Sequence, residues 1–388
     1  MDYPLADIRV LDLSRVLAGP FAGRMLSDLG AQVVKVEPPD RDVTRLWGKK
    51  TGLVSGYYNQ QNAGKMNISI DLREAEGINL LIRLAACADV LIENFRPGVM
   101  ARLGIPWTRL QEVNPRLIML SISGFGQSGP EAGRAAYAPI IHAETGVILR
   151  QATRSDADPV EMCMSFADTT AGLHGLVGLL SALHMRHRTG VGQHIDIAMV
   201  DAMVATDDHA HYHLEDAPVQ NGASEVWQAT GGPIILAGDF RHIWRQLSTL
   251  LGVTDPTPEN ASLDEKIRLR RAAAAAFFLS FETRAELIAA LDQARLAWGN
   301  VNSTASYLRD SPTLAHRHSV VQVDDRSGGL RDVVQSPYRF SGAKSGVSRG
   351  APLQGEHNTT ILHDWLDMPD AEITRLQDAG VLVREVSS

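Results

Sequence analysis

The first half of the chain alternates short apolar runs with longer amphipathic stretches, and this alternation restricts the folds it can adopt. Apolar, β-branched runs occupy residues 8–13, 32–37, 68–71, 88–94, 116–121 and 193–198. Helical patterns lie between them at 19–29, 73–86 and 169–188. Strands that alternate with helices are typical of parallel βαβ units. We therefore expect an α/β fold with a parallel sheet.

The pattern changes after residue 210. Residues 211–232 resemble a linker, and residues 233–325 hold one expected strand at 233–237 and several helices. Thr283 and Glu286 have the spacing of a capping box at the start of one of these helices. We expect a large domain over 1–210, a linker over 211–232, a small domain over 233–325 and a C-terminal segment over 326–388.

Three histidines, His209, His211 and His213, alternate near the end of a helix expected to begin at Met199. Side chains two positions apart on a helix point in different directions, so this spacing does not favour a metal site. Cys87 and Cys163 lie far apart in apolar surroundings and form neither a disulfide framework nor a metal cluster. We expect both cysteines to pack in the core and no metal to be bound.

Charge and segment composition exclude some partners. The net charge is -8 with 37 basic residues, which argues against a general nucleic-acid-binding protein. The N-terminus carries acids where a signal peptide has bases. The apolar stretch at 272–278 is far shorter than the ~20 residues of a membrane span. We expect a soluble, cytoplasmic protein without nucleic-acid or membrane partners.

Glycines at 124, 126 and 129 fit the G-x-G-x-x-G pattern of dinucleotide-binding turns. Pro130 and Gly133 follow where a helix would have to open, so we expect a loop that shapes a pocket wall. The strand-to-helix turn at 14–20 can present backbone N–H groups to an anion. Asp168 begins a long helical run, where a carboxylate is stabilised as an N-cap. These motifs alone do not decide the function.

Taken together, longer blocks of the sequence resemble the family III CoA-transferases. The matching blocks occur in family order at 10–20, 34–39, 62–65, 88–98, 124–130, 189–193 and 351–358. The family includes formyl-CoA transferases, crotonobetaine/carnitine CoA-transferases and α-methylacyl-CoA racemases. The resemblance implies a Rossmann-like large domain, completed by the C-terminal segment, with the smaller α/β domain inserted. It also implies an interlocked homodimer.

The resemblance also assigns roles to single residues. Asp168 matches the catalytic aspartate, and Tyr137 matches a tyrosine beside the reacting acyl group. Trp47 matches an active-site tryptophan. The positions that match the family's CoA pocket are Val16, Ala18, Lys65, Asn94, Phe95, Arg102 and Leu103. No permanently bound cofactor is implied, because coenzyme A and acyl-CoA are substrates.

The sequence departs from formyl-CoA transferases near the reacting centre. Leu17 replaces a glutamine, which argues against oxalate and favours a larger carboxylic or dicarboxylic acid, with succinyl-CoA a plausible donor. Arg15 is a candidate to meet a second carboxylate, with a structural acid as its alternative partner. The shielding glycine-rich loop of those enzymes has only Thr230-Gly231-Gly232 in the corresponding region.

The resemblance implies covalent catalysis. Asp168 attacks the donor thioester to give a mixed anhydride, the released thiolate forms an aspartyl-CoA thioester, and the acceptor acid reverses the steps. Two alternatives remain open. A 2-methylacyl-CoA racemase would need a histidine at position 137, and His142 is five residues out of register. A catalytically silent CoA-binding subunit of a hetero-oligomer is the other.

Overall fold

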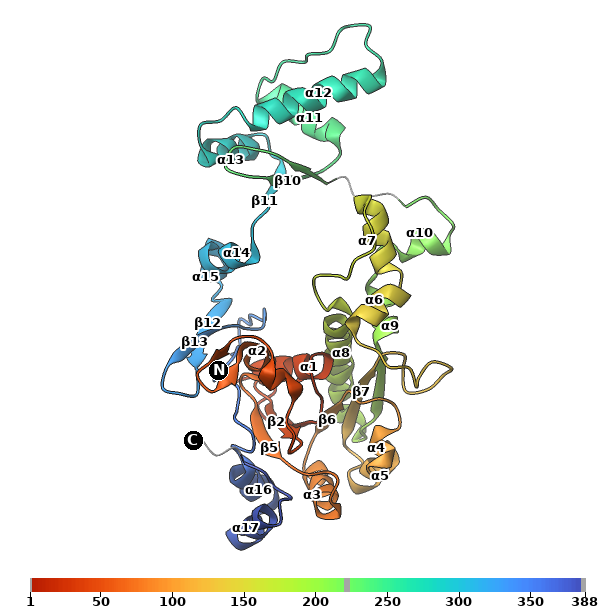
Figure 1. The fold of residues 1–388 in the computed structure, drawn as a ribbon, viewed down its shortest axis with the longest axis vertical. Coiled ribbons are helices and arrows are strands. Elements are labelled where there is room, and N and C mark those ends of the chain that lie inside the picture. Colours follow the sequence, from red (N-terminus) through yellow and green to blue (C-terminus); the bar gives the residue numbers. More distant parts are fainter. Residues whose placement is uncertain (1, 220–223, 385–388) are drawn as a thin grey trace. The chain divides into compact units, whose positions relative to one another are not determined.

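The computed structural model describes residues 2–219 and 224–384 (Figure 1). The chain forms two compact units, one from Met1–Asp208 with Ala315–Ser388 and the other from His209–Leu314. Residues 315–325, which the sequence pattern assigned to the small domain, belong to the larger unit. The reason is that β12 (Val320–Asp324) pairs with β13 (Leu330–Val334) in that unit.

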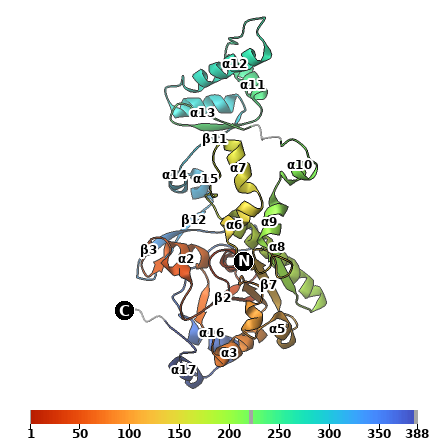
Figure 2. The same ribbon diagram turned by 45° about the vertical axis from the view of Figure 1, so that its right-hand side comes forward.

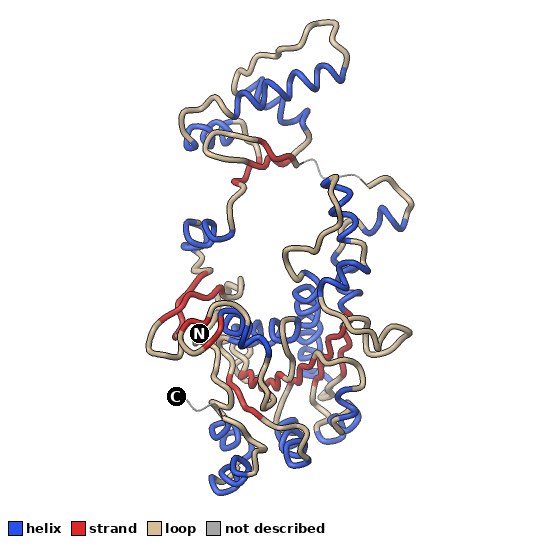
Figure 3. Tube along the Cα trace, in the orientation of Figure 1, coloured by secondary structure: helices blue, strands red, loops and turns tan. Residues whose placement is uncertain are grey.

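The core of the larger unit is a parallel sheet (Figure 3). Across the described residues it has six strands in the order β5-β2-β1-β6-β7-β8. Their bounds are β1 Arg9–Asp12, β2 Gln32–Glu37, β5 Met66–Ser69, β6 Val90–Glu93, β7 Ile118–Ser123 and β8 His194–Ala198. The expected parallel sheet is confirmed, and each expected apolar run forms one of these strands.

Strand order reverses between β1 and β6. The chain runs outward from β1 through β2 to β5, then returns to the other side of β1 and continues through β6, β7 and β8. The loops that follow the carboxyl ends of β1 and β6 therefore diverge and leave a crevice. In open α/β sheets such a crevice is the usual ligand site.

Helices cover both faces of this sheet (Figure 2). One face packs against α3 (Ala75–Ala86), α5 (Trp107–Val113), α16 (Asn358–Leu366) and α17 (Asp370–Asp378). The other packs against α1 (Ala18–Asp28), α6 (Ala138–Glu144), α8 (Phe166–Thr189) and α9 (Met199–Thr206). Val10 and Leu11 face opposite sides and are both fully buried. Burial on both faces explains why the strands read as continuous apolar runs.

The smaller unit has its own core. In its described part, an antiparallel sheet of order β11-β10-β9 joins β9 (Glu225–Trp227), β10 (Ile234–Ala237) and β11 (Ala297–Asn300). Its helices include α11 (Phe240–Leu250), α12 (Leu263–Phe278) and α13 (Arg284–Gln293). The expectation of one strand over 233–325 was wrong, because β11 also lies there, and β9 falls in the segment expected as a linker. Both strands are too short to give a clear apolar pattern in the sequence. The capping box of Thr283 and Glu286 is confirmed.

Two further expectations are corrected. The helix that begins at Met199 ends at Thr206, and the histidines lie around a separate short helix, α10 (Ala210–Leu214). Asp207 stands at the break, where its carboxylate lies 2.7 Å from Arg150 Nη1. Cys163 is exposed rather than packed in the core, whereas Cys87 is half-buried.

Candidate active site

A small cavity of about 80 Å³ lies at the crevice between the loops after β1 and β6. Many of the expected site residues meet there, although they come from distant parts of the chain. Val16 and Ala18 come from the first loop, Asn94 and Phe95 from the second, and Tyr137 and Asp168 from the starts of α6 and α8. The remaining lining residues are Arg96, Pro97, Ile122, Ser123, Gly124, Arg134, Ala136 and Met199.

Asp168 joins three helix starts at this cavity. It lies in the first turn of α8, whose N-cap is Ser165, so it is not the N-cap of its own helix. The backbone N–H groups of Ala18, the first residue of α1, and Ala138, the first residue of α6, favour the ionised form of its carboxylate and so lower its pKa. Burial outweighs these donors and raises the pKa of Asp168 to about 6. A carboxylate with a raised pKa and oriented donors is suited to nucleophilic work.

The first loop is held in an unusual conformation. Val16 has φ = 66°, a left-handed value that a β-branched residue rarely adopts. The side chain of Asn94 makes two hydrogen bonds to the backbone of Arg15, the residue before Val16. Its Oδ1 accepts the Arg15 N–H at 2.7 Å, and its Nδ2 donates to the Arg15 carbonyl at 2.8 Å. Asn94, which follows β6, therefore lines the cavity and also holds the loop that follows the neighbouring strand β1.

Aromatic side chains lie around Asp168. Tyr137 is the N-cap of α6, and its side chain is 65% exposed beside the cavity. Trp47 packs edge-on against Tyr57, with 5.1 Å between ring centroids. Burial, together with the negative charge of Asp168, raises the pKa of Tyr57 to about 12. Tyr57 is thus near enough for the charge of Asp168 to affect its pKa, whereas Trp47 contacts Tyr57 and lines none of the cavities described for residues 2–219 and 224–384.

A larger cavity of about 370 Å³ adjoins the first one, and Phe95 and Arg96 line both. Its volume is within the range of small-molecule sites. Arg15, Arg73 and Arg96 supply positive charge along its wall, and Arg73 is paired with Asp71 at 2.6 Å. The other lining residues are Leu13, Val36, Pro38, Pro39, Asp40, Ile70, Leu72, Val99 and Leu103. An apolar cavity edged with guanidinium groups suits a ligand that has both phosphates and apolar parts.

Arg96 was not singled out from the sequence. It lines both cavities, and also a third of about 120 Å³ beside Glu93 and His194. Its side chain is exposed, and within residues 2–219 and 224–384 its guanidinium has no hydrogen-bond or ion-pair partner. The turn that carries Arg96 is held by Glu93, whose Oε2 accepts the Phe95 N–H at 2.8 Å. Burial raises the pKa of Glu93 to about 7.

Three expected ligands are placed differently from the rest. Leu17 stands between Val16 and Ala18, but its side chain is only 7% exposed. Arg102 ends α4 (Val99–Arg102) with an exposed side chain, one residue before Leu103, which lines the larger cavity. Lys65 is fully buried, and its ammonium group donates to Asp12, Asn62 and the Pro20 carbonyl. Its structure supports a role inside the fold, because those three acceptors already use its donors.

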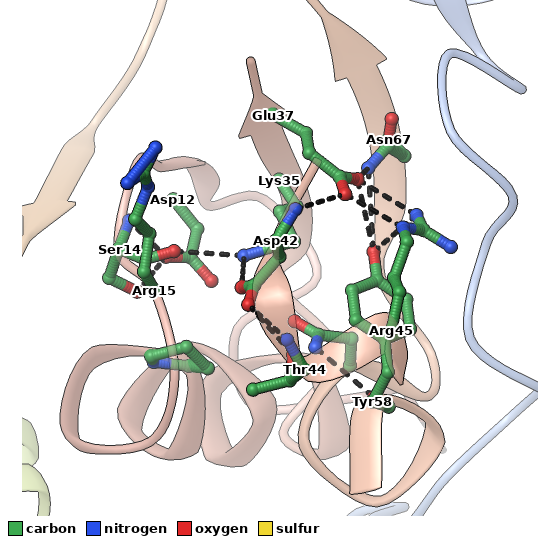
Figure 4. Close-up of polar contacts among 12 residues, drawn as sticks. Asp12, Ser14, Arg15, Lys35, Glu37, Asp42, Thr44, Arg45, Tyr58 and Asn67 are labelled. Carbon is green, nitrogen blue, oxygen red and sulfur yellow. Dashed lines mark hydrogen bonds and ion pairs between the residues drawn. The ribbon is translucent and has the colours of Figure 1, made fainter. Parts of the chain in front are cut away.

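Through Asp12, Lys65 belongs to a buried polar network beneath the first loop. Figure 4 labels Asp12, Ser14, Lys35 and Asp42 of this network. Lys35 Nζ lies 2.8 Å from the Ser14 carbonyl and 3.0 Å from Asp42 Oδ2. Nearby, Arg45 pairs with Glu37 at 2.7 Å. The network joins the end of β1 to β2 and to the 42–45 segment, so it supports the loop that carries Val16.

Comparison with known proteins decides the family. The sequence profile described as CoA-transferase family III matches residues 5–358. The chain belongs to CoA-transferase family III. It is 32% identical to a succinate–glutarate CoA-transferase of Agrobacterium fabrum, over 92% of this chain and 95% of that one. It is 31% identical to a succinyl-CoA–D-citramalate CoA-transferase of Chloroflexus aurantiacus, over 98% of each chain.

Solved structures agree with this assignment. A CaiB/BaiF family protein from Brucella suis superimposes with a TM-score of 0.81 at 32% identity, over 94% of this chain and all of that one. The chain therefore has the fold of family III CoA-transferases, which are enzymes that use CoA thioesters as substrates. Among the described residues, no helix is long and apolar enough to cross a membrane, and no group of His, Cys, Asp and Glu side chains could hold a metal ion.

Proposed function

We propose that the protein transfers CoA from a succinyl-CoA-type thioester to a free dicarboxylic acid, with Asp168 as the nucleophile. The observation that carries this proposal is the place of Asp168: its carboxylate, with a raised pKa, lines a cavity that begins at the helix starts of Ala18 and Tyr137 and adjoins an arginine-edged cavity. The substrate class follows relatives named for succinate, glutarate and citramalate. Leu17, in place of an amide, also favours acids larger than oxalate.

In the first half-reaction, an Asp168 oxygen attacks the thioester carbonyl and the C–S bond breaks, giving a mixed anhydride and CoA thiolate. The thiolate then attacks the aspartyl carbonyl, and the donor acid leaves as a carboxylate. The product is an aspartyl-CoA thioester. The acyl-bond energy is conserved because water takes no part.

In the second half-reaction, the acceptor carboxylate attacks the aspartyl thioester and releases the thiolate again. The thiolate attacks the acceptor carbonyl of the new anhydride, which yields the product thioester and free Asp168. The N–H groups of Ala18 and Ala138 favour negative charge on the Asp168 carboxyl group, where negative charge develops each time its carbonyl is attacked. They are therefore suited to act as an oxyanion hole.

We assign the larger cavity to CoA. Arg15 and Arg96 would meet phosphate groups, while Phe95 and Leu103 would contact apolar parts of the pantetheine chain. Tyr137 and Trp47 would lie beside the acyl group. The racemase alternative would require a free base near Asp168. His142 is 1% exposed, and its Nε2 already accepts the Ala167 N–H at 3.1 Å, so it does not fit that role.

An interlocked homodimer remains part of the proposal. One face of α8 carries Leu173, Val177 and Leu180, spaced to form a single stripe, with exposed fractions of 44%, 62% and 37%. A partner subunit would remove this apolar surface from water. Light scattering at micromolar concentration tests this, and a monomer would contradict it. A cytoplasmic location also stays a prediction.

Trapping the covalent intermediate tests the mechanism. The purified chain is incubated with succinyl-CoA and then with hydroxylamine, and peptides are analysed by mass spectrometry. We expect modification at Asp168 alone. The Asp168→Ala variant should bind CoA but lose transfer by several orders of magnitude. Transfer by that variant near the wild-type rate would overturn the mechanism, and inactivity of the wild-type chain by itself would favour a silent subunit.

A further inference from the structure

The loop between β1 and α1 is anchored on both sides of Val16. On one side, Lys35 donates to the Ser14 carbonyl at 2.8 Å, and the Ser14 N–H donates to Asp12 Oδ1 at 3.0 Å. On the other, α1 starts at once, with the Phe21 N–H donating to the Leu17 carbonyl at 2.7 Å. Between these anchors, Asn94 holds both backbone polar groups of Arg15.

This arrangement forces the strain onto one residue. A left-handed conformation is unfavourable for valine and persists only where the surroundings over-determine it. The Asn94 carboxamide is the part of those surroundings that comes from another strand, 79 residues from Arg15. Three residues after Arg15, Ala18 lines the same cavity as Asp168, and its N–H favours the ionised form of that carboxylate. The direction of that N–H depends on the backbone torsions of Val16 and Leu17.

We infer that Asn94 is a positioning residue for the transfer reaction: it holds Val16 in its left-handed conformation and thereby aims the Ala18 N–H at Asp168. This inference rests on the proposed role of Asp168 and adds to Asn94 a function beyond lining the smaller cavity. Without the clamp, Val16 relaxes toward negative φ and the N–H turns away. Asp168 then loses the effect of this N–H group in the ground state and in the oxyanions that form at its own carbonyl.

The consequence is measurable in the pH profile. A hydrogen bond to the ionised form lowers a carboxyl group's pKa, so its loss raises the pKa of Asp168 above about 6. Other ionisable groups face Asp168 and must stay unchanged in the comparison. They are Tyr57 from α2 (Gly56–Asn62), Tyr137 at α6, Arg96 and Arg134 on the cavity wall, and His142 behind Ala167.

The test is a double-mutant cycle of Asn94→Ala and Val16→Gly in the full-length enzyme. For Asn94→Ala we expect kcat to fall by about 10- to 100-fold and the acidic limb of kcat/KM to move up by about one pH unit. Glycine adopts positive φ without strain. The double variant should therefore have a higher kcat than Asn94→Ala, and its acidic limb should lie closer to that of the wild type. This comparison does not depend on the effect of Val16→Gly alone.

Asn114→Ala is the matched control. Asn114 also donates to backbone carbonyls, those of Ala85 at 3.0 Å and Ala88 at 2.8 Å, but it ends α5 away from the cavity. We expect it to lower the unfolding temperature and leave the acidic limb in place. If Asn94→Ala does not fold, the double variant should fold, because the strain has been removed.

Two results would overturn the inference. One is an Asn94→Ala enzyme with wild-type kcat and acidic limb and only a raised KM for the thioester, which would make Asn94 a simple ligand contact. The other is a double variant that recovers neither activity nor folding where Val16→Gly alone is folded. Failure of the proposed function is distinct, because it would show as transfer by Asp168→Ala.

Discussion

The ammonium group of Lys65 lies 2.7 Å from Asp12 Oδ2, and both side chains are fully buried. Asp12 ends β1, directly before the loop that carries Val16. Lys65 also reaches the first turn of α1 through the Pro20 carbonyl at 2.9 Å. Lys65 matches a CoA-binding position in the sequence, but in the structure it connects the two ends of the loop between β1 and α1.

Replacement of Lys65 tests this assignment. Lys65→Met leaves the Asp12 carboxylate buried with fewer partners, so we expect the free energy of unfolding to fall by about 3–5 kcal/mol. Urea unfolding measures this change. The CoA affinity of the folded fraction should stay within about twofold of wild type, since the side chain lines neither cavity. A large loss of affinity at unchanged stability would restore Lys65 as a ligand.

The pH profile tests Asp168. In the proposed mechanism the reactive form of Asp168 is the carboxylate, and burial raises its pKa to about 6. We therefore expect kcat/KM to be constant above pH 7 and to fall tenfold per unit as the pH drops below about 6. Glu93, with a pKa of about 7, could place a second ionisation nearby. The Glu93→Gln variant should keep the limb near pH 6; a limb that disappears in this variant would assign it to Glu93.

The same raised pKa predicts a cost in stability. The native state holds the Asp168 proton more tightly than the unfolded chain does, so ionisation destabilises the fold as the pH rises from about 4 to 6. We expect Asp168→Asn to raise the free energy of unfolding at pH 8 by about 1–3 kcal/mol. The gain should vanish below pH 4, where both states carry the proton. A destabilised variant at pH 8 would contradict the direction of the shift.

Arginine substitutions test the larger cavity. Arg96 is exposed to both main cavities, so we expect Arg96→Ala to weaken CoA binding about tenfold and to reduce the salt dependence of the dissociation constant. Arg102→Ala should also weaken binding more than it slows chemistry. Isothermal titration at low and high salt measures both. Unchanged affinity for CoA would show that the substituted arginine is a solvated surface charge and does not bind CoA.

The sequence could predict the sheet because each strand is a short run buried on both faces, which is a local pattern. It could not predict strand order, and so the crevice between β1 and β6 was visible only in the structure. The motif singled out Asp168 as a candidate, but the backbone N–H groups that lower its pKa lie on α1 and α6, far away in sequence. The left-handed Val16 has no local signature, since the clamp that accompanies it comes from Asn94.

Lys65 and Arg96 both show that the sequence alone does not reveal which side chains line a cavity. A lysine in an Asn-x-Gly-Lys block resembles a ligand, yet its burial depends on Asp12, 53 residues away. Arg96 resembles an ordinary surface charge, yet the turn at Glu93 and Phe95 places it where three cavities meet. In both cases the tertiary partners, and not the residue type, decide the role.

The last prediction concerns the acceptor acid. Leu17 lies in the chain between Val16 and Ala18, which both line the Asp168 cavity, and Arg96 is a cation on the wall of that cavity. Oxalate is small and highly polar, and it would lose the amide partner that a glutamine at position 17 provides. We expect kcat/KM for acids of four to six carbons with two carboxylates to exceed that for oxalate at least about tenfold, with succinyl-CoA as donor. Leu17→Gln should narrow this ratio. A preference for oxalate in the wild-type enzyme would show that position 17 does not govern the choice of acid.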